Sequence, residues 1–429
     1  MLSKKEKAVL TLIDKHTDDI VAYLQDLIRF KTITPPTGGR AEGDDYKGLQ
    51  DLVSQTLKEM GFSLDVWEAD AAELQRFPGS GIKPDRDLSN MPIVVGQLQG
   101  SGGGKSLILN GHYDVVSPGM LENWRHDPFG GELEGGKLFG RGAIDMKGGI
   151  AAMLQAVKFI QQAGVKLAGD LMVQTVPDEE SSCMGTLSCC QRGFKADAAI
   201  IPEPTDLKVL VAMRGSLYGK ITVLGRAGHA EETQPHWTEG GAVSAISKAV
   251  KVIQALEEQS EQWRTRPDKQ HKLLDPDVIV PTVIRGGEWP VTYPEKVDII
   301  FGSMFVPGTT GKRQEIEEQL LRIAALDPWL REHPPQLETG EWHYGAEIDE
   351  NEPIVQTGLQ ALSDLGIEPG LTGFGTLTDA IHLINYAKIP TISIGPSIKT
   401  AHMANEFVDI EELVKTTKAL ALAIMRWCG

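Results

Sequence analysis

Histidine and acidic side chains recur in five separated segments of the chain, each at the end of an expected strand or in the loop after it. The segments cover residues 111–116, 140–149, 177–181, 202–205 and 401–406. In a sheet protein, side chains at the carboxyl ends of strands converge where the loops meet. Histidine and carboxylate ligands suit zinc, with cobalt or manganese as substitutes. The sequence therefore predicts a divalent metal site at one edge of a sheet.

The first two segments offer a histidine and two aspartates with different tasks. His112 and Asp114 are two residues apart, so on a strand both side chains point to one face. A metal-bound imidazole usually has its other nitrogen held by a carboxylate or a carbonyl, so we expect His112 as a ligand and Asp114 as the residue that orients it. Asp145 lies at a loop-to-helix junction, where it either caps the helix or bridges two cations with its two oxygens. We expect the bridging role.

The remaining segments supply further acids and a second histidine. Residues 178–180 are three consecutive acids that end an apolar strand. On an exposed loop such a run is solvated, but after a buried strand the charges repel one another unless cations neutralise them. Glu179 and Glu180 point in different directions, so one is expected to bind metal while the other handles a proton. Glu203 sits in a stiff loop between two prolines, and His402 follows the last apolar strand.

The order of the expected elements predicts two domains. Strands alternate with helices up to residue 212, which indicates an α/β layer with a largely parallel sheet. From residue 213 the order becomes strand, helix, strand, strand, helix, strand, which is typical of a ferredoxin-like unit. Residues 347–429 return to the α/β pattern. The strands are expected at 92–100, 106–116, 170–180, 198–204, 217–225, 278–287, 295–306, 335–344 and 389–396, and the helices at 145–164, 240–263, 312–326, 353–366 and 409–427.

Length, charge and cysteine content limit the classes of protein that fit. A chain of 429 residues with 24% charged and 41% hydrophobic residues is globular and favours two domains. Its net charge of −17 disfavours a nucleic-acid partner. No stretch reaches the about 20 apolar residues that span a membrane, and the N-terminal segment is expected to form a surface helix rather than a signal peptide. The four cysteines do not form a disulfide framework, so a cytoplasmic location is expected.

In sequence order, the segments GHYDVV, GRGAIDMKGG, PDEES, PEPT and AHMANE carry a specific resemblance. With Trp124, Asp127-Pro128-Phe129-Gly130 and Gly228-His229, they resemble the two-metal amidohydrolase family of acetylornithine deacetylase, succinyl-diaminopimelate desuccinylase, aminoacylase-1 and the glutamate carboxypeptidases. The similarity covers nearly the whole chain. It implies a zinc-peptidase-like catalytic domain from residues 1–212 and 347–429, and an inserted ferredoxin-like lid and dimerisation domain at 213–346.

The resemblance also implies a role for each candidate residue. His112, Asp145 and Glu203 are expected to bind one zinc ion, and Asp145, Glu180 and His402 the other. Glu179 is expected to be the general base, and Asp114 to orient His112. A cis peptide bond is expected between Asp145 and Met146. His229, on the inserted domain, is expected to reach the active site of the partner subunit in a homodimer.

The implied reaction is hydrolysis of an amide bond in a small N-acyl amino acid or related N-acyl amine, of the deacetylase or desuccinylase type. A metal-bridging hydroxide attacks, and the glutamate base moves the proton. A dipeptidase or carboxypeptidase, or a deformylase of an N-formyl aminopyrimidine, is an alternative with the same centre. A non-catalytic binding protein is a remote alternative, because neither the base nor any ligand is lost.

The chain departs from its relatives where they bind a substrate carboxylate. Many relatives carry an arginine soon after a Thr/Ser-Asp motif, whereas Thr378-Asp379-Ala380 is followed here by isoleucine and histidine. An arginine that relatives often place in a central lid strand is also missing near residues 302–304. Arg214 and Arg285 are the candidate replacements, and Thr378 and Asp379 remain candidate substrate contacts. The departures make an amine without a carboxylate, such as an N-formyl aminopyrimidine, a plausible substrate class.

Overall fold

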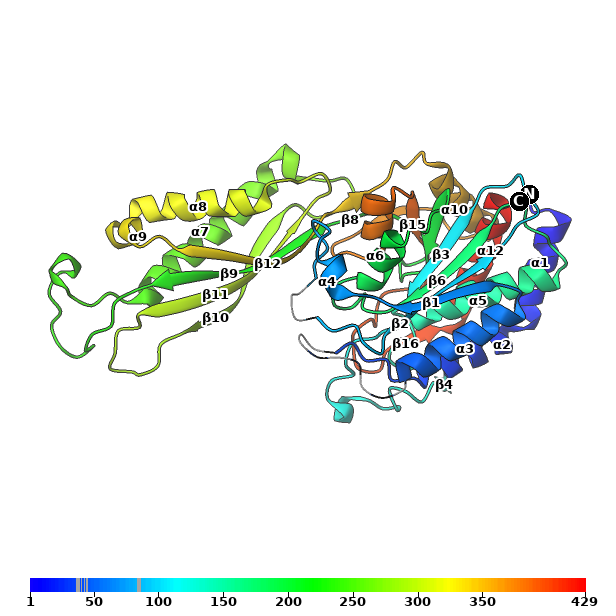
Figure 1. Cartoon of the computed structure of the whole chain (residues 1–429), viewed down its shortest axis with the longest axis horizontal. Helices are drawn as coiled ribbons and strands as arrows, with labels where there is room; N and C mark the ends of the chain where they lie inside the picture. The colour runs from blue at the N-terminus through cyan, green and yellow to red at the C-terminus, as the bar shows by residue number, and fades with distance from the viewer. Residues whose placement is uncertain (36–38, 40, 42, 44, 83–85) are drawn as a thin grey trace. The chain divides into compact units, whose positions relative to one another are not determined.

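The chain forms two compact units. The structure is a computed structural model that describes residues 1–35, 39, 41, 43, 45–82 and 86–429 (Figure 1). Unit 1 consists of Met1–Ala212, Glu347–Gly373 and Thr378–Gly429, and unit 2 of Met213–Ala346 and Phe374–Leu377. Unit 1 is an α/β unit and unit 2 an antiparallel sheet with helices, so the predicted fold class is confirmed. None of the helices in the described part of the chain is long and apolar enough to cross a membrane.

Unit 1 is built on a mixed sheet with the strand order β1-β2-β6-β3-β7-β15-β8-β13, and β14 pairs with β8. The strands are β1 (Ser63–Glu68), β2 (Pro92–Leu98), β3 (Leu107–His112), β6 (Leu171–Val176), β7 (Ala198–Ile201), β8 (Val209–Met213), β13 (Ala346–Glu347), β14 (Leu371–Phe374) and β15 (Thr391–Ser393). Strands β6, β3, β7 and β15 are parallel, but β2 runs against both β1 and β6, and β8 runs against β15. The sheet is therefore less parallel than predicted. In the described part of the connection between β1 and β2, the short helix α4 (Ala71–Leu74) is the one helix present, and an antiparallel pair needs no helical crossover.

The other helices of unit 1 cover the sheet (Figure 1). They are α1 (Lys4–Lys15), α2 (Thr17–Ile28), α3 (Asp45–Glu59), α5 (Lys147–Gln162), α6 (Met184–Gln191), α10 (Pro353–Asp364), α11 (Ala380–His382) and α12 (Ile410–Trp427). Helix α5 is the most enclosed at its start, where two glycines allow close packing. A Cβ at Gly148 would lie 2.3 Å from the carbonyl oxygen of Ala143, and one at Gly149 would lie 2.3 Å from that of Pro202. The glycine pair therefore lets α5 begin directly against two segments that carry candidate ligands.

The parallel strands bring the candidate side chains to one edge of the sheet. His112 is the last residue of β3, and Glu179 and Glu180 follow β6. Glu203 follows β7, and His402 lies in the segment after β15. Because parallel strands end at the same edge, four chain segments far apart in sequence converge there.

Unit 2 is an antiparallel sheet with the order β10-β11-β9-β12 and two long helices. Its elements are β9 (Gly215–Leu224), α7 (Ala245–Thr265), β10 (Val278–Gly286), β11 (Lys296–Phe305), α8 (Lys312–Leu326), the short helix α9 (Pro328–Glu332) and β12 (Gln336–His343). The core contains Trp263, Phe301 and Ile299, all fully buried. The predicted order of strands and helices is present, with α9 as an addition.

Asp327 caps α9 and provides the first test of this packing. Its carboxylate accepts the main-chain N–H of Trp329 at 2.9 Å and of Leu330 at 3.0 Å, and it binds the ammonium groups of Lys248 at 2.8 Å and Lys251 at 2.7 Å. We expect Asp327→Ala to lower the free energy of unfolding of unit 2 by about 2 kcal/mol, because the cap and the shared acceptor are both lost. Asp327→Asn should cost less, since asparagine also caps helices. Denaturant unfolding of the whole chain, with amide exchange in α7 and α9, measures both.

The charge on Asp327 also gives a pH dependence. Burial opposes its ionisation, but the hydrogen bonds from Lys248 and Lys251 outweigh burial and hold the pKa of Asp327 well below its usual range. The pKa is lower in the folded than in the unfolded chain, so the stabilisation is fully present above about pH 4 and is lost as pH falls toward the folded-state pKa. The difference in stability between wild type and Asp327→Asn should therefore shrink in acid. A difference that stays constant would contradict this account.

Candidate metal centre

Two groups of ligand-type side chains share one aspartate. His112, Asp145 and Glu203 form one group, and Asp145, Glu180 and His402 the other, with the ligand atoms of each group within 4.8 Å of one another. Asp145 Oδ1 lies 3.1 Å from His112 Nε2, whereas Asp145 Oδ2 lies 3.3 Å from His402 Nε2. Each oxygen of Asp145 thus faces a different group, which is the disposition that a bridging carboxylate needs.

The remaining distances suit a pair of divalent cations. Glu203 Oε1 lies 3.6 Å from His112 Nε2, and Glu180 Oε2 lies 3.0 Å from His402 Nε2. Glu203 Oε1 is buried and has no hydrogen-bond donor among the residues that the structure describes. A buried carboxylate oxygen without a donor is costly unless a cation binds it. The donor set of imidazoles and carboxylates therefore fits divalent metal.

Among the described residues, the imidazoles of His112 and His402 pair with the carboxylates of this cluster. Burial raises the pKa of Glu203 well above its usual range and that of Glu180 to about 7. Hydrogen bonds to Asp145 and Glu180 raise the pKa of His402 to about 10. Burial acts to raise the pKa of Asp145, but hydrogen bonds from the imidazoles of His112 and His402 outweigh burial and hold this pKa well below its usual range. Because a ligand histidine binds metal in its neutral form, divalent cations would take the place of these protons.

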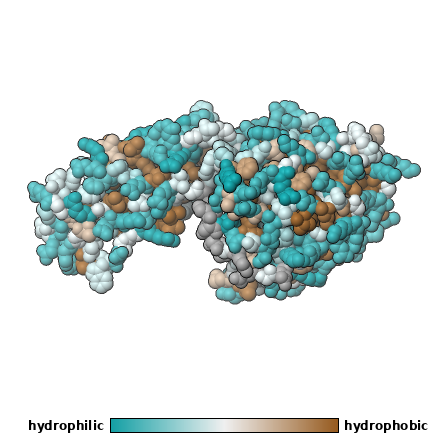
Figure 2. All heavy atoms as spheres, in the orientation of Figure 1, coloured by the Kyte–Doolittle hydropathy of each residue, from teal (hydrophilic) through white to brown (hydrophobic). Residues whose placement is uncertain are grey.

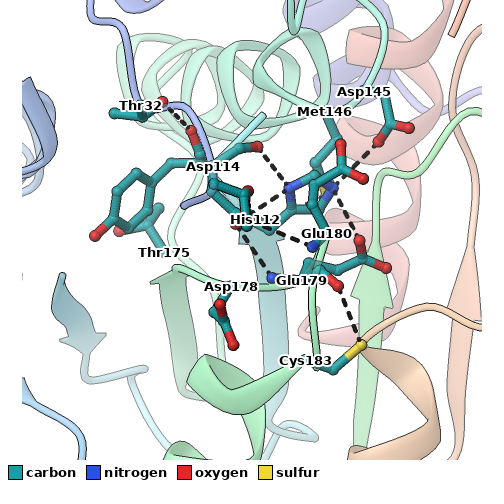
Figure 3. Close-up of polar contacts among 12 residues, drawn as sticks. Thr32, His112, Asp114, Asp145, Met146, Thr175, Asp178, Glu179, Glu180 and Cys183 are labelled. Atoms are coloured by element: carbon teal, nitrogen blue, oxygen red, sulfur yellow. Dashed lines mark hydrogen bonds and ion pairs between the residues drawn. The ribbon is translucent and has the colours of Figure 1, made fainter. Parts of the chain in front are cut away.

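Asp114 contacts the His112 ring with its main-chain carbonyl and the turn of Glu179 and Glu180 with its carboxylate (Figure 3). Its main-chain carbonyl lies 3.0 Å from His112 Nδ1, closer than its carboxylate Oδ1 at 3.6 Å. The carboxylate instead accepts the N–H groups of Glu179 at 3.2 Å and Glu180 at 3.3 Å, and the hydroxyl of Thr34 at 2.7 Å. The atom nearest the histidine is thus the carbonyl, and the carboxylate fixes the turn that carries the two glutamates.

Glu179 lies beside the ligand groups without belonging to either. Its Oε2 is 3.9 Å from His112 Nε2. Burial raises the pKa of Glu179 well above its usual range, and the charges of Glu203 and Glu180 act in the same direction. A carboxyl whose pKa is raised toward neutrality is suited to accept and return a proton.

The turn before Glu179 contains a buried ion pair that no sequence motif indicates. Asp178 has a left-handed backbone with φ of 73°, and its carboxylate accepts the Ser182 hydroxyl at 2.7 Å. The same carboxylate pairs with Arg86, whose guanidinium also donates to the carbonyl of Pro35 at 3.1 Å. Arg86 lies 92 residues from Asp178, so only the fold brings them together.

The two arginines predicted as substrate contacts belong to unit 2, whereas both ligand groups belong to unit 1. Arg214 donates to the carbonyl oxygens of Gly375 at 2.8 Å and Pro276 at 3.1 Å, so its guanidinium already holds main chain. Arg285 is exposed on β10. His229 is exposed in unit 2 as well, where it forms a β-bridge with Thr292.

Thr378 and Asp379 are buried in unit 1 at the start of α11. The Thr378 hydroxyl accepts the N–H of Ala380 at 3.2 Å and so belongs to the helix start. Among the residues that the structure describes, the Asp379 carboxylate has no hydrogen-bond partner within the usual distance. The hydroxyl of Thr186 acts to lower the pKa of Asp379. Burial nevertheless raises the pKa of Asp379 to about 7, and its charge in turn raises the pKa of Glu179. Asp379 thus lies within electrostatic reach of the centre.

Residues 108–426 match the model of the Peptidase family M20/M25/M40. The chain belongs to this family. Two curated relatives are N-formyl-4-amino-5-aminomethyl-2-methylpyrimidine deformylases. The one from Halalkalibacterium halodurans is 32% identical over 98% of this chain and 97% of its own. The one from Bacillus subtilis is 31% identical over 97% of this chain and 96% of its own.

Solved structures agree with this fold assignment. A dipeptidase from Saccharomyces cerevisiae has a TM-score of 0.73 at 16% identity, covering 100% of this chain and 99% of its own. The aminopeptidase PepT from Bacillus cereus has a TM-score of 0.70 at 18% identity, covering 96% and 98%. The predicted family resemblance is confirmed. This M20 chain is an amide-hydrolysing enzyme of small N-acyl compounds with a cluster suited to divalent metal.

Proposed function

We propose that this M20 enzyme removes the formyl group from an N-formyl aminopyrimidine, releasing formate and a free amine. Both curated relatives named above carry that activity in their names and align over nearly the full chain. The observation in the site that supports it most is Asp379. Within electrostatic reach of Glu179, unit 1 presents the buried carboxyl group of Asp379. In unit 2, the guanidinium of Arg214 is engaged with main-chain carbonyls. A substrate carboxylate would be repelled there, whereas an aminopyrimidine carries none.

We propose two zinc ions for the two ligand groups, with cobalt or manganese as substitutes. His112, Asp145 and Glu203 would hold one ion, and Asp145, Glu180 and His402 the other. Bound there, the cations would polarise the formyl carbonyl and lower the pKa of water. The carbonyl of Asp114 fixes the tautomer of His112 by accepting its Nδ1–H.

In the proposed reaction Glu179 carries the proton. Its carboxylate accepts a proton from the attacking water, whose oxygen forms a bond to the formyl carbon. The carbon–nitrogen bond then breaks, and Glu179 donates the same proton to the leaving nitrogen. The carboxylate of Asp114 keeps Glu179 in place through the main-chain N–H.

A substrate panel tests the proposal. The zinc-loaded enzyme would be assayed on an N-formyl aminopyrimidine, N-formyl and N-acetyl amino acids, N-acetylornithine, N-succinyl-diaminopimelate, an N-carbamoyl amine and several dipeptides. We expect the highest kcat/KM on the formyl aminopyrimidine. A higher value on an N-acyl amino acid or a dipeptide would favour the deacylase or peptidase alternative and contradict the deformylase.

We also propose that unit 2 joins two copies of the chain. Strand β10 is an edge strand, and it exposes Val280 and Ile284 beside Ile246 and Val250 of α7, each 43–53% exposed. A groove of about 650 Å³ runs between β10 and α7. Figure 2 gives the hydropathy of one face of the molecule, where hydrophobic patches interrupt a mainly hydrophilic unit 2. An apolar sheet edge next to an apolar helix face suits self-pairing about a two-fold axis.

Ile284→Lys is expected to convert the dimer to a monomer, because a charge on the edge strand opposes its burial against a second copy. Sedimentation velocity of the full chain measures the change. Leu326→Lys is the matched control, since Leu326 is 79% exposed on α8 and lies outside the β10–α7 surface. A wild-type chain that sediments as a monomer would refute the dimer.

His229 is proposed to act in such a dimer, as the family resemblance implies, by binding the substrate carbonyl in the partner's site. Its exposure and the backbone bond from Ala230 to Val291, at 2.8 Å, support a fixed loop with a reachable imidazole. Mixing His229→Ala with Glu179→Gln chains should restore part of the activity, because one of the two sites in each hybrid dimer then has both groups.

A further inference from the structure

Glu406 lies where two segments of unit 1 meet. It follows His402 by four residues and directly precedes β16 (Phe407–Asp409). Strand β16 pairs with β5 (Lys137–Phe139), which leads into the 140–145 turn that ends at Asp145. The residue therefore sits between the chain segments of two candidate ligands.

The contacts of Glu406 all reach that turn. Its Oε1 accepts the main-chain N–H of Ile144 at 2.9 Å and of Asp145 at 3.3 Å. Its Oε2 accepts Nη1–H of Arg141 at 2.6 Å, and its own carbonyl accepts the N–H of Gly140 at 2.9 Å. A single side chain thus holds the main chain of Asp145, the residue that both ligand groups share.

The segment of His402 depends on such anchoring. The His402 side chain is 52% exposed, so packing does little to fix it. Its backbone is left-handed, with φ of 61°, and the same is true of Asn405 at 60°. Asn405 is bonded to the 123–125 loop at 2.6 and 2.9 Å, and Glu406 to the 140–145 turn. These two neighbours tie the segment to the 123–125 loop and the 140–145 turn, in addition to the contacts of His402 itself with Asp145 and Glu180.

A contribution to the stability of the fold does not by itself explain why residue 406 is a buried glutamate. Burial raises the pKa of Glu406, and the charge of Arg141 opposes that rise. Replacing a buried ion pair by apolar side chains is often neutral or stabilising. What an apolar pair cannot do is accept the two N–H groups at Ile144 and Asp145. The geometry of those two hydrogen bonds is therefore the property that requires a carboxylate.

We propose that Glu406 is a positioning residue, which fixes Asp145 relative to the segment of His402 and so sets the affinity of the cation site formed by Asp145, Glu180 and His402. The inference rests on the two-metal assignment proposed above. Outer partners that orient metal ligands typically change affinity by about 10–100-fold when they are replaced. Glu406 acts on the ligand through the main chain, without touching substrate.

The test is a metal titration of the metal-free full chain. Zn²⁺ and Co²⁺ binding would be measured for wild type and Glu406→Gln by calorimetry and, for Co²⁺, by the visible absorption of the bound ion. We expect Glu406→Gln to weaken the site of Asp145, Glu180 and His402 by about 10–100-fold, and the other site, which shares Asp145, by less. The more strongly weakened class of site should be the one abolished by His402→Asn. At saturating metal, kcat should fall while KM changes little.

Glu6→Gln is the matched control. Glu6 is also buried and bonds to an arginine, Arg426, at 2.7 Å, but it belongs to α1, away from the ligand groups. The Glu6→Gln variant should be less stable than wild type but should bind metal with unchanged affinity. Glu406→Leu combined with Arg141→Met removes both charges, and we expect a folded chain with the same weakened site.

The outcomes separate the two proposals. A wild-type chain that binds no divalent cation contradicts the two-metal assignment itself. A wild-type chain that binds two, with Glu406→Gln or the double variant binding both equally tightly, overturns only the role of Glu406.

Discussion

Glu179→Gln is expected to lower kcat by at least about 10²–10⁴-fold while leaving the bound metal unchanged. The amide keeps the size and position of the side chain but cannot take a proton from water. Glu179 belongs to neither ligand group, and its Oε2 lies 3.9 Å from His112 Nε2, so the metal should stay bound. Turnover of the best substrate and elemental analysis of the same preparation measure the two quantities together.

The neighbouring residue supplies the control for this experiment. Glu180 is one residue away but has its oxygen 3.0 Å from His402 Nε2. Glu180→Gln should therefore lose a cation, which Glu179→Gln retains. The reverse result, with metal lost in Glu179→Gln and kept in Glu180→Gln, would exchange the two roles.

The convergence of the candidate ligands was predictable because most of them lie at the end of a strand or in the loop after it. The parallel strands β3, β6, β7 and β15 finish at one edge, so His112, Glu203 and His402 converge there by topology alone. The bridging role of Asp145 was expected from its place at a loop-to-helix junction, whereas the two ligand sets followed from the resemblance. The distances of 3.1 and 3.3 Å now give the shared position a geometric basis. The cis peptide between Asp145 and Met146 is likewise present as expected.

Long-range polar contacts could not be predicted in the same way. Arg86 meets Asp178 through the fold, and the carboxylate of Asp114 reaches the turn of Glu179 rather than only its own histidine. The antiparallel direction of β2 could not be predicted either. The pattern of buried residues in a strand does not encode the direction in which the strand runs relative to its neighbours. A glutamate four residues after the candidate ligand His402 was visible in the motif, but its partner Arg141 is 265 residues away.

Asp145→Asn should remove both cations, whereas Glu203→Gln should remove one. Asparagine offers one neutral carbonyl oxygen, so it cannot supply a charged donor to each side. Asp145 is the residue common to both groups, and its two oxygens face different imidazoles. Replacing a residue that only orients a metal ligand typically lowers affinity by about 10–100-fold. We expect Asp145→Asn to lower the affinity of both sites by more than that. Equilibrium dialysis with Zn²⁺, at matched protein concentration, gives the number bound.

The comparison with Glu203→Gln decides between bridging and a simple ligand role. Glu203 belongs to one group only, so its replacement should leave the site of Asp145, Glu180 and His402 occupied. If Asp145→Asn also retained one tightly bound cation, Asp145 would serve a single site, and the second would need another donor. If Asp145→Asn binds neither cation while circular dichroism shows an intact fold, both sites need the carboxylate of Asp145. Each ion then takes a charged ligand from the same side chain, and this shared carboxylate makes the centre a two-metal centre.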